Sequence, residues 1–428
     1  MALKKNILKI SKLFFILVLF FIFSCSITKK IERQIIEESE VNNYFRGFVV
    51  YNTKTQKEII NYNGAKYFTP ASNTKLFTFY TALRTFKDSV TGFEYELLKD
   101  SLIIKGSADP SFLYGFKDNR SLEFLKNASQ GVYLIDKNIE ESVYGAGWSW
   151  DDYVYSYMPE KSIFPIYGNL LEVSKSKDSI EVKPYFFNKY ITVSDQLTLR
   201  RDKEENRFYF NRSEEIEELK IPFKTSVQLF ADLLSDEIGS KVTLIPDKDS
   251  YNLKKFKSVN YDSLYVRMLE ESDNFIAEQL MLQVGNKVDS VYSVRRAISY
   301  SLDNYLKEIP QKPRWVDGSG LSRYNLFTPE SLVFLLKKMH REIPEEKLLS
   351  YFAIGGKSGT LKNYYKNEKP YIYAKSGTLS NNYNLSGYLK TKKGTILIFS
   401  YMNNHYQGSS VVRKREMEKF FLQLYEKY

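Results

Sequence analysis

The spacing of hydrophobic residues changes several times along the chain, and each change predicts a different kind of element. A continuous apolar run, Leu13–Phe23, follows a lysine-rich start. Its length is typical of a signal peptide and too short for a membrane span, so residues 1–24 are expected to lie outside the folded protein. A charged amphipathic stretch over 27–41 predicts a short helix. Short runs rich in apolar residues then occupy 46–52 and 58–62 on either side of a polar turn at 52–56, which predicts a hairpin.

Helical spacing follows the hairpin, because Leu76, Phe77, Tyr80 and Leu83 recur on one face. From about residue 91 to residue 246 the pattern changes to short alternating segments separated by polar turns, which predicts a β-rich block. The strands expected in this block lie at 102–104, 132–135, 180–182, 190–193 and 208–210.

Helices are expected again after Asn260, and the chain ends with strands and one helix. Apolar residues within 264–269 and 275–284 predict two helices, and a third is expected over 329–340. The last expected elements are strands at 371–374, 384–389 and 395–400 and a helix at 411–428.

Composition and charge narrow the classes of protein. The 428 residues are enough for more than one domain, and Lys plus Arg number 62 against 51 Asp plus Glu. This mild excess is spread along the chain and predicts no nucleic-acid partner. The only cysteine, Cys25, comes directly after the apolar run and resembles a bacterial lipoprotein site. Ordinary secretion with an incidental cysteine is the alternative; either way the chain leaves the cytoplasm and forms no internal disulfide.

Ser72 and Lys75 form the first candidate chemical pair. They are three residues apart at the start of a predicted helix, with Pro70 at its entrance, so they share one face. A serine hydroxyl becomes a nucleophile when a base takes its proton, and a lysine does this only when it is neutral. Burial or a second cation lowers the pKa of a lysine. On this stretch alone, a helix cap followed by a solvated lysine explains the spacing as well.

Two further motifs favour the interpretation of Ser72 and Lys75 as a nucleophile and its base. Ser272-Asp273-Asn274 follows the β-rich block, and Lys375-Ser376-Gly377-Thr378 follows the strand expected at 371–374. Ser272 and Asn274 are two residues apart and cannot share a helical face, so a turn between helices is expected there. Ser-x-x-Lys, Ser-x-Asn and Lys-(Ser/Thr)-Gly, in this order, are typical of penicillin-binding proteins and serine β-lactamases.

The chain resembles the serine D-alanyl-D-alanine carboxypeptidase/endopeptidase family, the class C low-molecular-mass penicillin-binding proteins. The resemblance covers nearly all of the mature chain and rests on the motifs Thr69–Leu76, Asp317–Arg323, Gly106–Pro110 and Gly147–Asp152, in addition to the three above. It implies an α+β fold in which an antiparallel sheet flanked by helices forms a penicillin-binding/serine β-lactamase-like catalytic domain. That domain is expected to comprise 25–90 and 247–428, with a β-rich domain, 91–246, inserted between the first and second motifs.

The resemblance also implies roles for the first two motifs. Ser72 would attack the carbonyl of a D-Ala-D-Ala bond in a peptidoglycan stem peptide, and Lys75 would take its proton. Ser272 would pass the proton to the leaving amine. Asn274 would hold Lys75 and the substrate amide. The implied location is the periplasm or cell envelope, with the membrane reached only through a lipid on Cys25.

For the third motif, Lys375 would lower the pKa of Lys75 and attract the substrate carboxylate, which Ser376 and Thr378 would bind. Gly377 belongs to the same substrate-binding stretch. The backbone amides of Ser72 and Thr378 would form the oxyanion hole. No metal or cofactor is expected, and β-lactam antibiotics would be covalent inhibitors.

Several alternatives share parts of these patterns. A β-lactamase or esterase would use the same Ser/Lys site, and an inactive envelope lipoprotein would only bind peptidoglycan. A histidine triad is disfavoured because the two histidines, His340 and His405, lie on an amphipathic helix and in a turn. The letters Lys-Ser-Gly-Thr-Leu also occur at 357–361, where Gly355-Gly356 predicts a loop. We therefore place the third motif at 375–378, where a strand enters it and another leaves.

The Gly-rich motifs at 106–110 and 145–152 carry a simpler interpretation. Turn chemistry explains both, with a buried aromatic anchor in the second, and we expect no catalytic role for either.

Overall fold

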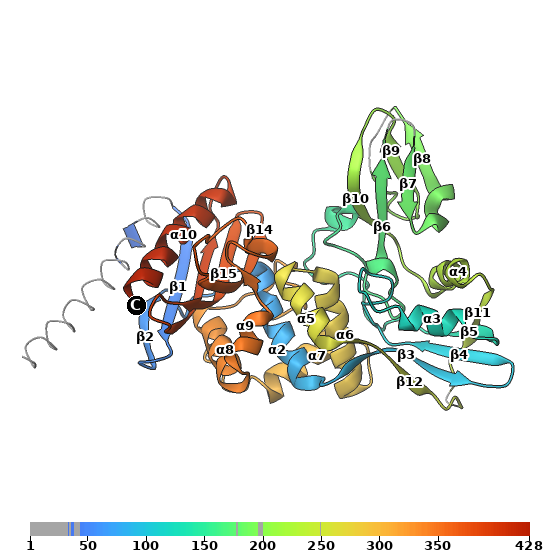
Figure 1. Ribbon diagram of the computed structural model, residues 1–428, viewed down its shortest axis with the longest axis horizontal. Coiled ribbons are helices and arrows are strands. Elements are labelled where there is room, and N and C mark those ends of the chain that lie inside the picture. The colour runs from blue at the N-terminus through green and yellow to red at the C-terminus, as the bar shows by residue number, and fades with distance from the viewer. Residues whose placement is uncertain (1–32, 34–35, 38–42, 177–178, 196–199, 249) are drawn as a thin grey trace, which may run out of the picture.

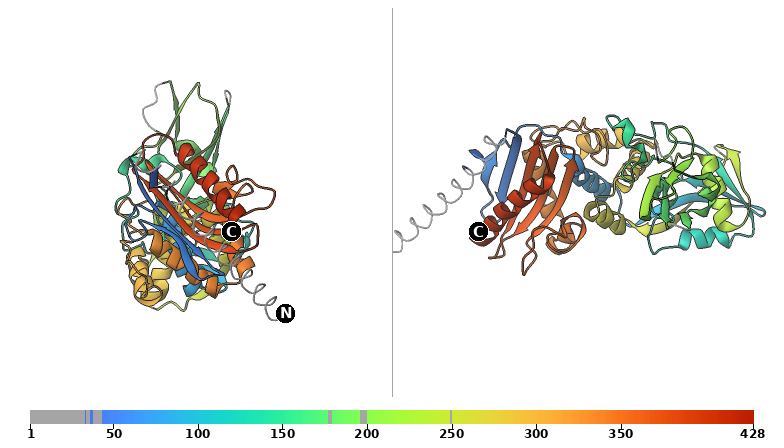
Figure 2. Two further views of the ribbon diagram at one scale, coloured as in Figure 1. Left: turned by 90° about the vertical axis from the view of Figure 1, so that its left-hand side faces the viewer. Right: turned by 90° about the horizontal axis from the view of Figure 1, so that it is seen from above.

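The computed structural model describes residues 33, 36–37 and 43–428, apart from 177–178, 196–199 and 249. The expected signal peptide at 1–24, the candidate lipidation residue Cys25 and most of the helix expected at 27–41 lie outside these residues. In the described part of the chain, no helix is both long and apolar enough to cross a bilayer. The molecule is elongated, with a sheet at one end, a group of helices in the middle and the β-rich part at the other end (Figures 1 and 2).

The first sheet has six strands in the order β13-β14-β15-β16-β1-β2, and all neighbouring strands are antiparallel. Alternation along β1 decides its two faces: Phe48 and Val50 pack with α10, whereas Val49 joins the core under α8. The strands are β1 (Phe45–Asn52), β2 (Lys57–Tyr62), β13 (Ala353–Ile354), β14 (Ile372–Leu379), β15 (Asn382–Lys390) and β16 (Ile396–Asn404).

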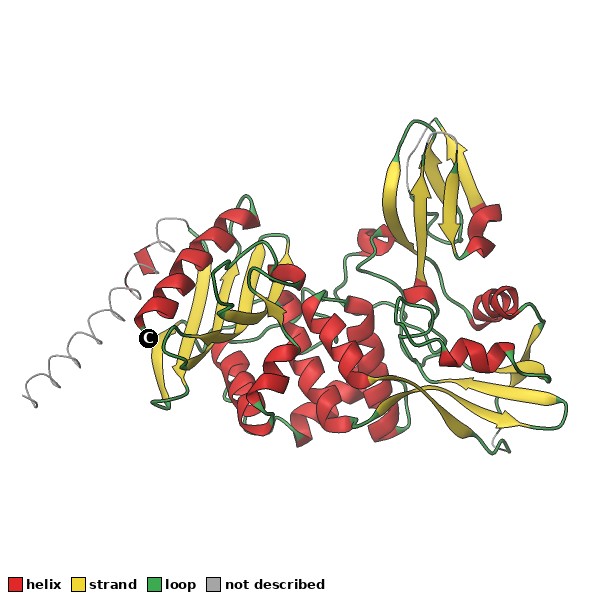
Figure 3. Ribbon diagram, in the orientation of Figure 1, coloured by secondary structure: helices red, strands yellow, loops and turns green. Residues whose placement is uncertain are grey.

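The helices that accompany the six-stranded sheet lie on both of its sides and extend toward the β-rich part (Figure 3). The buried helix α2 packs against α5, α6 and α8. The bounds are α2 (Lys75–Thr85), α5 (Tyr261–Glu270), α6 (Asn274–Asp289), α7 (Val294–Asn304), α8 (Pro329–Glu342), α9 (Glu345–Ser350) and α10 (Ser410–Lys427).

The β-rich part contains a five-stranded sheet in the order β11-β5-β4-β3-β12, a three-stranded sheet β10-β6-β7 and the pair β8-β9. The smaller sheets project away from the long axis of the molecule (Figure 1). The elements are β3 (Ser89–Leu97), β4 (Ser101–Gly106), α3 (Arg120–Lys126), β5 (Gly131–Asp136), β6 (Leu170–Lys175), β7 (Ile180–Lys183), β8 (Ile191–Ser194), β9 (Phe208–Asn211), β10 (Ile216–Pro222), α4 (Val227–Ile238), β11 (Val242–Pro246) and β12 (Lys254–Asn260).

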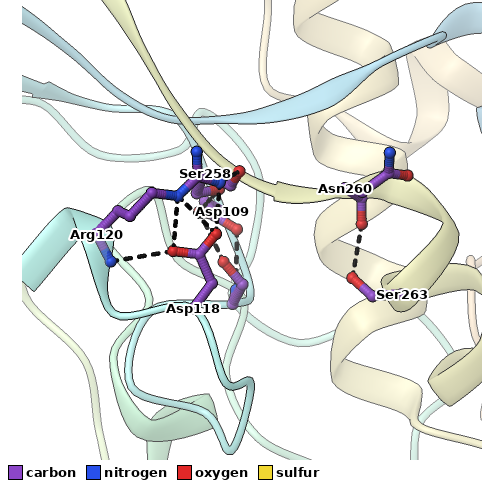
Figure 4. A network of polar contacts seen from close by, with 7 residues as sticks. Asp109, Asp118, Arg120, Ser258, Asn260 and Ser263 are labelled. Atoms are coloured by element: carbon purple, nitrogen blue, oxygen red, sulfur yellow. Dashed lines mark hydrogen bonds and ion pairs between the residues drawn. The ribbon is translucent and has the colours of Figure 1, made fainter.

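The sheet of the β-rich part extends past residue 246, where we expected the insertion to end. β12 pairs antiparallel with β3, so the strand that leads back to α5 still belongs to the inserted sheet. Buried Asp109 fixes this strand by accepting a hydrogen bond from Ser258 (2.6 Å), while Arg120 donates to the Ser258 carbonyl (Figure 4). The boundary is therefore corrected to about Asn260. The sequence of β12 alone could not reveal its pairing with β3, a distant strand of the same chain.

Candidate active site

Ser72 lies in a short 3-10 turn, Ala71–Thr74, and not in the α-helix that we expected to start near Pro70. The α-helix begins at Lys75. Ala71 has a φ of 48°, a left-handed conformation that is uncommon for a residue with a side chain. The turn nevertheless keeps the expected relationship, because Lys75 Nζ lies 3.0 Å from Ser72 Oγ.

The Lys75 amine has three partners. It donates to Asn274 Oδ1 at 2.5 Å and to the Ser319 carbonyl at 2.7 Å, and Ser72 Oγ is the third. The first two partners can only accept, so they use two N–H groups. A neutral amine then has its lone pair left for the Ser72 hydroxyl proton. The three contacts therefore fit a lysine that acts as a base toward Ser72.

Burial favours the neutral form of the Lys75 amine over the ammonium form. Lys75 is fully buried, and burial lowers the pKa of its amine to about 8. The carboxylates of Asp317, Glu278 and Asp273 oppose this shift because they favour the ammonium form. A substantial fraction of Lys75 is thus neutral near pH 8.

The second motif occupies the expected turn between two helices. Ser272 joins α5 to α6 with a left-handed φ of 66°, and Asp273 caps α6 by accepting a hydrogen bond from the Ile276 amide. Asn274 is the first residue of α6, which directs its Oδ1 to Lys75. Its Nδ2 donates to the Tyr157 carbonyl at 2.8 Å, so the β-rich part also positions this amide.

The third motif lies on β14, next to the first motif. Lys375 Nζ donates to Ser272 Oγ at 2.8 Å and to the Ser376 carbonyl at 2.7 Å. Asn73 Nδ2 donates to the Lys375 carbonyl at 3.1 Å and joins this strand to the turn that carries Ser72. At Gly377 a side chain would meet the Pro70 carbonyl, so the close approach needs a glycine. Thr378 is exposed at the end of the strand.

The expectation that Lys375 lowers the pKa of Lys75 needs a correction, because burial is the main cause of that shift. Lys375 is itself fully buried. Burial, followed by the charge of Lys75, keeps the pKa of the Lys375 amine well below its usual range. Each ammonium disfavours the other, so the site favours one charged lysine over two.

The turn Asp317–Arg323, which the sequence analysis used only to support the family resemblance, positions a partner of Lys75. The Asp317 carboxylate is buried and accepts hydrogen bonds from the amides of Gly320 (2.9 Å) and Ser322 (2.6 Å) and from the Asn325 side chain. The amide held at Gly320 belongs to the same peptide unit as the Ser319 carbonyl that contacts Lys75. Asp317 therefore fixes one of the three partners of the base.

The motif at 145–152 contacts this turn directly. Trp148 Nε1 donates to Asp317 Oδ2 at 2.9 Å, and the Ala146 carbonyl accepts from Ser322 Oγ. The expected buried aromatic anchor is therefore wrong in two respects: Trp148 is half-buried and binds a carboxylate, and Trp150 is 73% exposed. Sequence reasoning missed the contact because the two residues are separated by 169 positions.

The two Lys-Ser-Gly-Thr copies differ in placement. Lys357 is exposed and precedes a 3-10 turn, Gly359–Leu361, whereas Lys375 is buried in β14 and reaches Ser272. The structure thus forms two groups of contacts, Ser72–Lys75–Asn274 and Ser272–Lys375. The hydrogen bond from Asn73 to the Lys375 carbonyl joins them. Among the described residues, no group of three or more His, Cys, Asp or Glu side chains is arranged to hold a metal ion.

Comparisons with known proteins agree with this geometry. The model of the D-Ala-D-Ala carboxypeptidase 3 (S13) family matches residues 27–423. The D-alanyl-D-alanine carboxypeptidase DacB of Haemophilus influenzae is 25% identical over 423 residues, which cover 86% of this chain and 87% of that protein. The D-alanyl-D-alanine carboxypeptidase of Actinomadura sp. is 22% identical, covering 87% and 80%.

Solved structures show the same fold. Penicillin binding protein 4 from Haemophilus influenzae has a TM-score of 0.75 at 20% identity, covering 89% of this chain and 96% of that one. A predatory endopeptidase from Bdellovibrio bacteriovorus has a TM-score of 0.53 at 16% identity, covering 89% and 92%. The predicted fold class, an α+β penicillin-binding protein, is therefore confirmed.

Proposed function

This chain belongs to the D-Ala-D-Ala carboxypeptidase 3 (S13) family, and we propose that it is a serine peptidase that cleaves the terminal D-Ala-D-Ala bond of peptidoglycan stem peptides. The observation that carries the proposal is the 3.0 Å contact between Nζ of buried Lys75 and Oγ of Ser72, across which a neutral amine would accept the nucleophile's proton. The two D-alanyl-D-alanine carboxypeptidases similar over most of the chain support the choice of substrate.

In the acylation step, Ser72 Oγ attacks the carbonyl carbon between the two D-alanines, and its proton moves to Lys75 Nζ. The carbonyl oxygen becomes an oxyanion, for which the backbone amides of Ser72 and Thr378 are the proposed donors. Collapse of this intermediate breaks the carbon–nitrogen bond and leaves an ester on Ser72.

The leaving D-alanine needs a proton on its nitrogen. We assign this step to Ser272; its oxygen accepts from Lys375, so its own hydrogen can be donated to the leaving nitrogen. Ser272 regains a proton from the Lys75 ammonium, which restores the neutral base. A water molecule then attacks the ester carbon and loses a proton to Lys75. The bond between that carbon and Ser72 Oγ breaks, and Lys75 returns the proton to Ser72 as the shortened peptide leaves.

Substrate orientation is proposed to come from the third motif. Lys375 and the hydroxyls of Ser376 and Thr378 would bind the terminal carboxylate of the peptide, next to Ser272. A β-lactam presents a similar carbonyl and carboxylate, so it would acylate Ser72 and act as a covalent inhibitor. The complex of the Haemophilus influenzae protein with a β-lactam supports this.

The proposal is tested by labelling the purified mature chain with a fluorescent penicillin and by measuring D-alanine release from a peptide ending in D-Ala-D-Ala. Both signals are expected from the native chain and neither from Ser72→Ala. D-alanine release by Ser72→Ala would refute the assignment. A cross-linked stem-peptide dimer serves as a parallel substrate, because endopeptidases are among the proteins of similar fold; its cleavage would extend the activity to cross-links.

We also propose that the protein works in the cell envelope, anchored by a lipid on Cys25. The lone cysteine after the apolar run supports this location, as does a peptidoglycan substrate outside the cytoplasm. Mass spectrometry of the membrane-extracted N-terminus is expected to find an acylated Cys25. A protein released into solution and cleaved at another residue would exclude the anchor.

A further inference from the structure

Helix α6 carries a second residue aimed at the catalytic base. Glu278 lies one helical turn after Asn274, on the same face, and is 2% exposed. Its Oε1 accepts a hydrogen bond from the Ser319 amide at 2.7 Å, and the Ser319 carbonyl accepts from Lys75 Nζ at 2.7 Å. Asn274 thus contacts Lys75 directly, and Glu278 reaches it through one backbone residue.

The ionised form of Glu278 is unfavourable because its carboxylate is buried and lies near the carboxylate of Asp317. Glu278 faces Asp317 from the turn, Lys161 from the β-rich part and Lys75 from α2, and Lys161 is itself paired with Glu141 at 2.7 Å. The second oxygen, Oε2, is buried and has no hydrogen-bond partner in the described structure. Burial, and then the charge of Asp317, raise the pKa of Glu278 to about 7. A glutamine would accept the same Ser319 hydrogen bond without this cost, so the charge itself needs an explanation.

Glu278 also lines a cavity that is separate from the contacts around Ser72. It measures about 510 Å³, and Glu278, Lys161, Glu141 and Asp317 are among the residues that line it. The carboxyl group therefore borders a space that is not lined by the residues in contact with Ser72.

We propose that Glu278 is a positioning residue that acts on Lys75 through Ser319: it holds Ser319 through Oε1, and its negative charge stabilises the ammonium that Lys75 becomes when it takes the Ser72 proton. The inference rests on the proposed function, in which neutral Lys75 is the base. It differs from a purely structural role because it couples the charge of Glu278 to the pH dependence of acylation.

Two variants separate the effect of the Glu278 charge from its hold on Ser319, and a third variant is the control. Glu278→Gln keeps an oxygen for the Ser319 amide and removes the charge. Glu278→Asp keeps the charge and shortens the side chain by one methylene, which withdraws it from Ser319. Glu418→Gln is the matched control, because Glu418 likewise accepts from a backbone amide, that of Tyr365, but lies on α10.

The rate constant of acylation by a fluorescent penicillin is measured across pH for the native mature chain and each variant. In Glu278→Gln the part of the profile where the rate rises with pH, the acid limb, is expected to move to lower pH by about 0.5 to 1 unit, because a lost negative charge lowers the pKa of Lys75. The maximal rate at high pH, the plateau, is expected to fall because the ammonium of Lys75 is less stabilised. Glu278→Asp is expected to keep the native limb with a plateau at least about tenfold lower, since Ser319 is no longer held. Glu418→Gln is expected to match the native profile.

A Glu278→Gln profile that superimposes on the native limb, or moves to higher pH, overturns the inference. Should that variant fail to fold, Glu278→Asp still decides, because a native plateau contradicts the positioning role. If the native chain is not acylated at Ser72 at any pH, the proposed function fails instead, whatever the variants do.

Discussion

Ser376 Oγ donates a hydrogen bond to Thr360 Oγ1 at 2.8 Å, so the two Lys-Ser-Gly-Thr copies of the chain are in contact. The copy at 357–360 lies in a loop beside the strand that carries the copy at 375–378. Their lysines point to different surroundings, since Lys375 is buried against Ser272 and Lys357 is exposed. Identical sequence in one chain therefore provides an internal control for the third motif.

The two lysines are predicted to differ strongly in effect. Lys375→Ala should lower the rate of acylation by orders of magnitude, because it removes the partner of Ser272 and the proposed partner of the substrate carboxylate. Lys357→Ala should change the rate less than about tenfold, equivalent to about 1.4 kcal/mol of barrier. The kinetics of acylation by penicillin measure both effects. A larger loss of rate in Lys357→Ala than in Lys375→Ala would show that the third motif is the copy at 357–360.

The pH dependence of acylation should follow Lys75. Since its pKa is lowered to about 8 by burial, the rate should rise with pH and level off above about pH 8, where the amine is neutral. Lys75→Ala should reduce acylation by about 10²- to 10⁴-fold, the usual contribution of a general base. A pH profile of the native chain that falls as pH rises through 8 would contradict this base.

Gly320 is predicted to be irreplaceable for a steric reason. Its φ is +83°, and a Cβ at this position would overlap the Ala71 carbonyl next to Ser72. Gly394 has nearly the same φ, +82°, but a Cβ added there would meet no atom within 4 Å. Gly320→Ala should therefore abolish acylation, while Gly394→Ala should retain it with a small loss of stability; equal effects in labelling and thermal unfolding would refute the packing argument.

The two tryptophans of the motif at 145–152 form a further matched pair. Trp148→Phe removes the donor to buried Asp317 Oδ2 and should lower the free energy of unfolding by about 1–3 kcal/mol. Trp150→Phe should have little effect, because Trp150 is 73% exposed. Denaturant unfolding monitored by circular dichroism measures both, and a Trp150 effect as large as that of Trp148 would show that the Asp317 contact is unimportant.

Much of the fold could be predicted from local pattern. Apolar runs on either side of a polar turn predicted β1 and β2, helical spacing predicted α8 and α10, and the separation of Ser272 from Asn274 predicted the turn before α6. These features depend on neighbouring residues, whose period decides which face is buried.

The parts that could not be predicted depend on distant pairing. β12 joins the inserted sheet by pairing with β3, about 160 positions earlier, and no local signal marks that partner. The same holds for the Trp148–Asp317 contact and for Glu278, whose role appears only when Ser319 lies between it and Lys75. The cause of the Lys75 pKa shift was also hidden, because burial is a property of the folded chain.

The most direct test of the central claim is peptide mapping of the purified mature chain after treatment with penicillin. We expect one covalent adduct, on the peptide that contains Ser72, which is lost in Ser72→Ala and stays on the same peptide in Ser272→Ala. An adduct on any other residue, or none on folded protein, would contradict the assignment of Ser72 as the nucleophile.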